Sequence, residues 1–184
     1  TLRFIFNRLL DAANSIILYS PLMIDDIEKL RVNIDRSKIV IIKNAVDIQR
    51  FRPRNNKIGN TILYVGRIHP LKGIENIIIA VSDIIKNNST VKLIVVGLVE
   101  SKKYFQTLKQ LTVKLGCEKN VNFVGPVPNE SIIQYYNSSK VFVLMSLTEG
   151  IPRSILEAMS CGIPVIATPV AGIPDVIKHG INGF

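Results

Sequence analysis

One segment in the last third of the chain constrains the fold more than any other. Residues 141–145 are apolar and predict a buried strand, a short polar loop follows, and Pro152 stands where a helix would begin. Proline suits the first helical position because its φ is fixed and its missing N–H is not needed there. Cys161-Gly162 ends the helix, and residues 164–167 begin another buried strand. Strand, loop, helix and strand in this order predict a parallel α/β sheet.

The same alternation runs through the rest of the chain. Short apolar runs bounded by turn residues predict strands, and apolar residues at helical spacing predict helices. The predicted strands are 15–19, 39–42, 61–65, 91–96 and 121–124, and the predicted helices are 22–30, 74–86, 104–115 and 131–136. We therefore expect an α/β protein with a doubly wound parallel sheet.

Two carboxylates flank the start of the helix in the first segment. Glu149 lies in the loop after the strand, and Glu157 lies about one and a half turns into the helix. The helical amides between them have no intrahelical partner and carry the positive end of the helix dipole, which suits a phosphate. Sugar hydroxyl groups could donate to both carboxylates. The spacing leaves two interpretations open: a sugar–phosphate–ribose site, or two solvated surface charges.

The residues at this helix start are candidates for phosphate binding. They are Gly150, Ile151, Pro152, Arg153 and Ser154. Arg153 stands out because a cation in the first turn opposes the helix dipole. It either serves an anionic ligand or is a tolerated surface charge.

A second cluster follows the strand at 61–65. Gly66 permits close approach of the backbone, and Arg67 and Lys72 place two cations over the same edge of the sheet. Arginine suits bidentate phosphate contacts, and lysine acts as a point charge. The cations either clamp an anion or are ordinary surface charges. His69, which lies between them, is assigned no role.

Together these residues resemble the donor-binding domain of retaining glycosyltransferases with the two-domain GT-B fold. The resemblance covers most of the chain and rests on Gly66-Arg67, Lys72-Gly73, Glu149, Glu157, Gly162-Ile163-Pro164-Val165, Gly172-Ile173-Pro174 and Gly180-Ile181-Asn182-Gly183-Phe184. This family transfers a hexose from a nucleotide sugar to a lipid, glycan or small molecule. The resemblance implies that the sheet is the Rossmann-like half of a GT-B fold.

The resemblance also implies roles for single residues. Arg67 and Lys72 would neutralise the leaving nucleotide diphosphate, Glu149 would hold the sugar hydroxyls, and Glu157 would hold the ribose. Val127 would face the nucleotide base, although it could equally be a plain turn residue. No metal ion is implied, since the two cations would neutralise the diphosphate charge. No separate cofactor is implied either, because the nucleotide diphosphate sugar is a substrate.

Three positions depart from the family pattern. Ala45 replaces a usual glycine, which predicts a mild cost if the backbone there needs a positive φ. Gly97-Leu98-Val99 lacks the second glycine of the usual Gly-acid-Gly, which puts a backbone contact to the ligand in doubt. Met145 replaces a usual proline, which affects only the geometry of the loop.

The resemblance divides the chain into three parts. Residues 1–45 are expected to be the tail of the acceptor-side domain, residues 46–60 an interdomain linker, and residues 61–184 the donor-binding domain, incomplete at its carboxyl end. We therefore expect a fragment, or one piece of a split protein, that binds the donor weakly without transferring sugar.

Composition narrows the class of partner. The formal net charge of +9 favours anionic partners, although lysine-rich surfaces also serve solubility alone. No aromatic stripe interleaves the basic residues, so no nucleic-acid partner is expected. The two cysteines and two histidines are scattered, which predicts neither a disulfide framework nor a metal site. We therefore expect a cytoplasmic protein.

Residues 1–12 combine basic residues with an apolar helical face of Leu2, Ile5, Phe6, Leu9 and Leu10. A packing helix is favoured. The alternative is a helix that lies on the inner face of the membrane.

Two other functions stay open. One is a non-catalytic nucleotide-binding or regulatory module. The presence of both carboxylates and both cations in the same chain argues against this function. The other is a GT-B-like nucleotide-sugar epimerase, against which the spacing of Glu149 and Glu157 argues.

Overall fold

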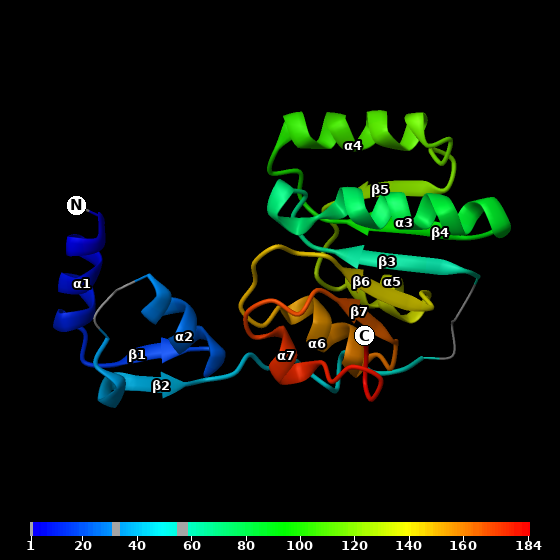
Figure 1. The fold of residues 1–184 in the computed structure, drawn as a ribbon. Helices are drawn as coiled ribbons and strands as arrows, with labels where there is room; N and C mark the ends of the chain where they lie inside the picture. The colour runs from blue at the N-terminus through cyan, green and yellow to red at the C-terminus, as the bar shows by residue number, and fades with distance from the viewer. Residues whose placement is uncertain (1, 31–33, 55–58) are drawn as a thin grey trace.

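The computed structural model describes residues 2–30, 34–54 and 59–184, and its centre is a five-stranded parallel sheet (Figure 1). The strands are β3 (Thr61–Val65), β4 (Lys92–Val96), β5 (Val121–Gly125), β6 (Val141–Leu144) and β7 (Val165–Ala167). Their order is β5-β4-β3-β6-β7. A second parallel sheet pairs β1 (Ile16–Leu18) with β2 (Ile39–Ile41). The predicted α/β class is confirmed.

Helices accompany both sheets: the first two lie with the β1–β2 sheet and the others with the main sheet (Figure 1). They are α1 (Leu2–Ala12), α2 (Leu22–Lys29), α3 (Ile74–Asn87), α4 (Lys102–Lys114), α5 (Ile132–Asn137), α6 (Arg153–Ser160) and α7 (Ile173–Val176), with 3-10 turns η1 (Arg36–Lys38) and η2 (Pro70–Lys72). α3 shows why such segments fold as helices. Its buried residues Ile74, Ile77, Ile78 and Val81 recur at the spacing that puts them on one face.

Two helix starts differ slightly from the prediction. Pro152 is the N-cap of α6, with a ψ of 128°, and not its first helical residue. Glu157 therefore lies about one turn into α6. α4 begins at Lys102 because the Ser101 side chain caps it by accepting a hydrogen bond from the amide of Tyr104 at 3.3 Å.

The order of the strands indicates at which edge of the sheet a ligand would bind. The chain runs outward from β3 through β4 to β5 and then returns to the other side of β3 with β6 and β7. In sheets of this kind ligands bind beyond the carboxyl ends of the strands, where the order reverses. The loops after β3 and β6 meet there, and the amide of Leu147 donates to the carbonyl of Leu71 at 2.9 Å.

The structure bears on two expectations for the amino-terminal part. α1 forms, but its apolar residues Phe4, Ile5 and Leu9 are 64%, 55% and 63% exposed, so these three side chains are not buried against the described residues. Ala45 does not adopt a positive φ, since Ala171 is the one non-glycine residue that does so in the described ranges. The condition for a backbone cost at Ala45, a positive φ, is therefore not met. Within these ranges no helix has the length and apolarity needed to cross a bilayer.

Three tyrosines combine burial with a hydroxyl group that donates to a fixed acceptor. Tyr64 donates to the carbonyl of Arg67 at 2.7 Å, Tyr136 donates to Glu157 Oε2 at 2.6 Å, and Tyr104 donates to Glu75. Burial is the main cause that raises the pKa of each tyrosine, and neighbouring carboxylates add to it. The three rings therefore stay neutral in the folded chain when free tyrosine would ionise.

We expect alkaline pH to destabilise the fold through these tyrosines. Above pH ~10 the unfolded chain loses phenolic protons that the folded chain retains, so the free energy of unfolding falls as pH rises. Urea denaturation between about pH 8 and 11 measures this slope. Tyr136→Phe should fall less steeply than wild type, and equal slopes for the two proteins would contradict the assignment.

A second prediction concerns Gly73, which follows η2 with a φ of 59°. A Cβ there would lie 2.1 Å from the carbonyl oxygen of Met145, so Gly73→Ala must displace backbone. Gly116→Ala is the matched control, because Gly116 has a φ of 65° and no atom within 4 Å of the added Cβ. Both should lose about 1–2 kcal/mol from left-handed strain, and Gly73→Ala about 1–3 kcal/mol more in urea denaturation. Equal losses would refute the close contact.

Candidate functional site

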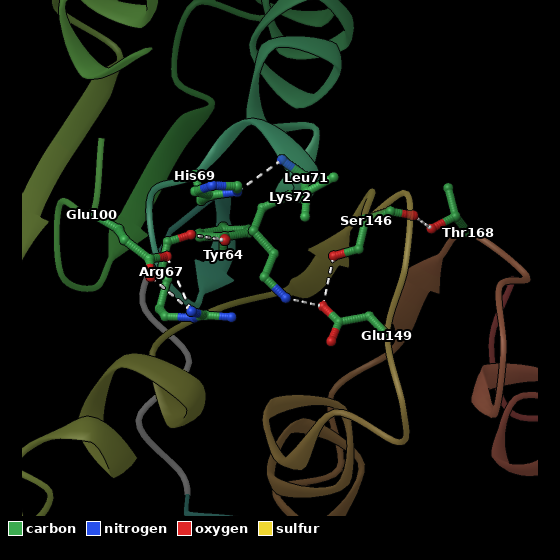
Figure 2. Close-up of polar contacts among 9 residues, drawn as sticks. All are labelled: Tyr64, Arg67, His69, Leu71, Lys72, Glu100, Ser146, Glu149 and Thr168. Atoms are coloured by element: carbon green, nitrogen blue, oxygen red, sulfur yellow. Dashed lines mark hydrogen bonds and ion pairs between the residues drawn. The ribbon is translucent and has the colours of Figure 1, made fainter. Parts of the chain in front are cut away.

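A cleft of about 440 Å³ opens at the carboxyl edge of the main sheet. Its walls are Arg67, His69, Leu71, Lys72, Glu100, Thr148 and Glu149. These residues come from the loops after β3, β4 and β6, which the strand order brings together (Figure 2). The structure thus unites three of the predicted site residues, Arg67, Lys72 and Glu149.

Lys72 and Glu149 form the central ion pair of this cleft. Lys72 Nζ donates to Glu149 Oε1, and both side chains are only 13% exposed. The hydroxyl group of Ser146 donates to the same Oε1 at 2.7 Å, and Thr168 Oγ1 donates to the Ser146 carbonyl at 2.5 Å. Figure 2 shows the Lys72 and Glu149 side chains pointing toward one another from separate loops. Glu149 is therefore held in one orientation.

Arg67 lies at the more open side of the cleft. Its Nη1 donates to both oxygens of Glu100, at 2.9 and 3.1 Å, and the side chains are 62% and 40% exposed. The Tyr64 hydroxyl group holds the Arg67 backbone by donating to its carbonyl. Each cation of the cleft thus already has a carboxylate partner.

His69, which was assigned no role, shapes the loop between the cations. Its Nδ1 accepts a hydrogen bond from the amide of Leu71 at 3.2 Å and so caps η2. Because Lys72 is the last residue of η2, this turn fixes the position of the Lys72 backbone and so the direction of its side chain.

Gly66 serves a contact between strands. Its amide donates to the carbonyl of Val96 at 2.9 Å, and a Cβ on Gly97 would lie 1.8 Å from the Gly66 carbonyl oxygen. The close backbone approach predicted for Gly66 is therefore made by Gly97 at the end of the neighbouring strand β4.

Glu157 and Val127 are predicted site residues that do not line the cleft. Glu157 lies on α6 and accepts from Tyr136 of α5. Val127 follows β5 and packs partly buried against the core. Among residues 2–30, 34–54 and 59–184, neither residue forms a hydrogen bond or ion pair with Arg67, Lys72 or Glu149.

The residues at the start of α6 directly follow Glu149 and contact the segment after β2. Ile151 is buried, and its carbonyl accepts from Asn44 Nδ2 at 2.6 Å, whereas Arg153 is exposed. In the described ranges the amides of Arg153 and Ser154 donate to no protein acceptor. Such amides are suited to an anion.

Sequence reasoning missed several partners of the predicted residues. They are Glu100, Ser146, Thr168, Tyr136 and Asn44. Glu100 carried one usable signal, because it follows β4, the neighbour of β3, as Arg67 follows β3. The others are common residue types whose positions depend on tertiary contacts. Among residues 2–30, 34–54 and 59–184, no group of three or more His, Cys, Asp or Glu side chains could hold a metal ion.

Residues 46–184 match the family described as Glycosyl transferases group 1. An uncharacterized glycosyltransferase of Methanocaldococcus jannaschii is 36% identical over 123 residues, which cover 67% of this chain and 30% of that protein. A D-inositol 3-phosphate glycosyltransferase of Frankia alni is 27% identical over 166 residues, which cover 82% of this chain and 41% of that protein. The chain therefore spans less than half the length of these relatives.

Among solved structures, HepE of Anabaena in complex with UDP and glucose is similar at a TM-score of 0.85 and 26% identity. The match covers 100% of this chain and 52% of that one. The family match and the structural similarity both agree with the family resemblance seen around Arg67 and Lys72 and around Glu149 and Glu157. The chain belongs to the Glycosyl transferases group 1 family, and its main sheet is a Rossmann-like half of the GT-B fold.

Proposed function

We propose that this chain carries the donor site of a retaining glycosyltransferase that moves a hexose from a nucleotide diphosphate sugar to a lipid, glycan or small-molecule acceptor. The observation that carries the proposal is the convergence of Arg67, Lys72 and Glu149 on one cleft at the reversal of strand order. Membership of the family supports the reaction class. The UDP and glucose bound to the similar HepE support the class of donor.

In this proposal the donor diphosphate lies on Arg67, Lys72 and the free amides at the start of α6. Lysine has three N–H donors, so Lys72 retains Glu149 while it donates to a phosphate. As the bond from the anomeric carbon to the diphosphate oxygen breaks, negative charge grows on the leaving group. The two cations stabilise that charge from fixed positions, which is often the largest catalytic contribution. No metal ion is needed for this step.

The remaining predicted residues extend the proposal to the rest of the donor. Glu149, oriented by Ser146, accepts from sugar hydroxyl groups. Tyr136 donates to Glu157 Oε2, which leaves Oε1 to accept from the ribose. Val127 faces the base. Residues 1–45 belong to the acceptor side and residues 46–60 link it to the donor-binding part at 61–184.

The first test is calorimetric titration of the chain with UDP, GDP and ADP, with Arg67→Ala compared with wild type. We expect one nucleotide to bind and Arg67→Ala to weaken it by about 1–3 kcal/mol, as for a lost charged hydrogen bond. Arg36→Ala is the matched control, because Arg36 is 66% exposed and paired with Glu28 at 2.6 Å away from the cleft. Equal binding by wild type and Arg67→Ala would refute the site, and binding without any turnover would favour a non-catalytic module.

A second test uses the pairing of Arg67 with Glu100. A bound diphosphate must share or displace Glu100, so Glu100→Gln should tighten nucleotide diphosphate binding about 2- to 5-fold, the range of an exposed ion pair. The gain should shrink as salt rises, because exposed charges are screened. Glu118→Gln, at an exposed acid outside the cleft, should change nothing. Weaker binding by Glu100→Gln would mean that Glu100 contacts the ligand directly.

A further inference from the structure

We infer that Asn44 is a positioning residue for the loop that carries Glu149, and that it couples the segment before the main sheet to the donor site. Asn44 follows β2 and lies outside the segment matched to the family, 46–184. The inference rests on the proposed function, because it concerns the same donor site.

The first observation is a hydrogen bond between distant parts of the chain. Asn44 Nδ2 donates to the carbonyl of Ile151 at 2.6 Å in a partly buried contact. Ile151 follows Glu149 by two residues and precedes α6 by two. The first turn of α6 does not use this carbonyl, since the amide of Ile155 donates to Pro152 instead, at 3.2 Å. A buried carbonyl needs a partner, and Asn44 supplies it.

The second observation is close packing around the same loop. A Cβ on Gly150 would lie 3.3 Å from the ring of Tyr19, which follows β1. A Cβ on Gly172 would lie 2.7 Å from Ile151 Cγ1 and 3.1 Å from Ser20 Cβ. Residues 150–151 are therefore enclosed between the end of β1 and the turn before α7.

The third observation is a hydrogen bond between the segment after β1 and α7, the two segments that enclose residues 150–151. Ser20 is fully buried, and its hydroxyl group donates to Asp175 of α7 and accepts from the amide of Leu22 at 3.1 Å. Figure 1 shows the β1–β2 sheet on the side of α7, with the segment after β2 passing beneath that helix. The β1–β2 sheet is thus connected through Ser20 to α7, which adjoins the loop at residues 150–151.

The consequence for the site follows from where the loop is held. Lys72 and Ser146 hold the Glu149 carboxylate, and Asn44 holds the backbone just beyond it. Removing the Asn44 amide leaves the Ile151 carbonyl unpaired and frees the loop between these points. Small displacements of a positioned group reduce binding and rate steeply. The contact of Glu149 with the sugar should suffer more than contacts with the nucleotide.

The test compares wild type with Asn44→Ala and Asn44→Asp, which has nearly the same shape and no N–H donor. Asn60→Ala is the matched control, because Asn60 Nδ2 donates to Thr90 Oγ1 at 2.7 Å at the other end of β3. Affinities for UDP-glucose and UDP are measured by calorimetry, thermal stability in parallel, and hydrogen exchange in peptides covering 147–155 without ligand.

We expect both Asn44 variants to exchange faster in 147–155 and to lose about 10-fold or more in UDP-glucose affinity with little change for UDP. Asn60→Ala should change neither. Asn44→Ala combined with Glu149→Gln should lose less than the sum of the single losses, because both act through one contact. If Asn44→Ala does not fold, Asn44→Asp carries the same comparison.

The inference is overturned if the exchange of 147–155 stays as in wild type. It is also overturned if the affinities for UDP and UDP-glucose fall equally, since a merely structural residue would act that way. The exchange measurement needs no ligand. If wild type bound neither UDP nor UDP-glucose, that result would count against the proposed function, and the loop exchange would still decide the role of Asn44.

Discussion

The adjacency of β3 and β6 is the constraint on which the site depends. Because the order of strands reverses at this point, the loops after the two strands meet, and Lys72 pairs with Glu149 across 77 residues of sequence. Both side chains are largely withdrawn from solvent, and the desolvation cost of such a pair is not always offset by its attraction. The extra hydrogen bond from Ser146 reduces that cost and fixes the carboxylate. The pair is better explained by the need for placed charges than by stability.

The two ion pairs of the cleft differ in a way that suits different tasks. Lys72 and Glu149 are mostly buried, whereas Arg67 and Glu100 are exposed to solvent. An exposed pair contributes ~0–1 kcal/mol and exchanges partners at little cost. In the proposed function, the diphosphate replaces Glu100 at Arg67 while Lys72 keeps Glu149 in place. Each cation of the cleft is offset by a neighbouring carboxylate, so the charges of the two ion pairs sum to zero.

The loop after β6 lies where the two sheets of the chain meet. Its frame comes from Asn44 and Ser20 on one side and from Gly172 and Asp175 on the other. The position of Glu149 is therefore shared between the main sheet and the segment that precedes it. If the proposed donor site is correct, its geometry depends on the placement of the amino-terminal sheet as well as on the strands of the main sheet.

The sequence by itself determined the α/β class, the strands to within about two residues, and the placement of Gly66, Arg67 and Glu149 in loops that follow strands. These features follow from local signals: apolar periodicity, glycine and proline at element ends, and residues placed directly after parallel strands. Only the tertiary structure decided which carboxylate each cation meets, that Tyr136 holds Glu157, and that Asn44 caps Ile151. It also decided that the apolar face of α1 is exposed and that Gly97 fills the space beside Gly66. The physical reason is that periodicity and capping act between near neighbours in sequence, whereas side-chain pairing depends on strand order and packing between segments far apart.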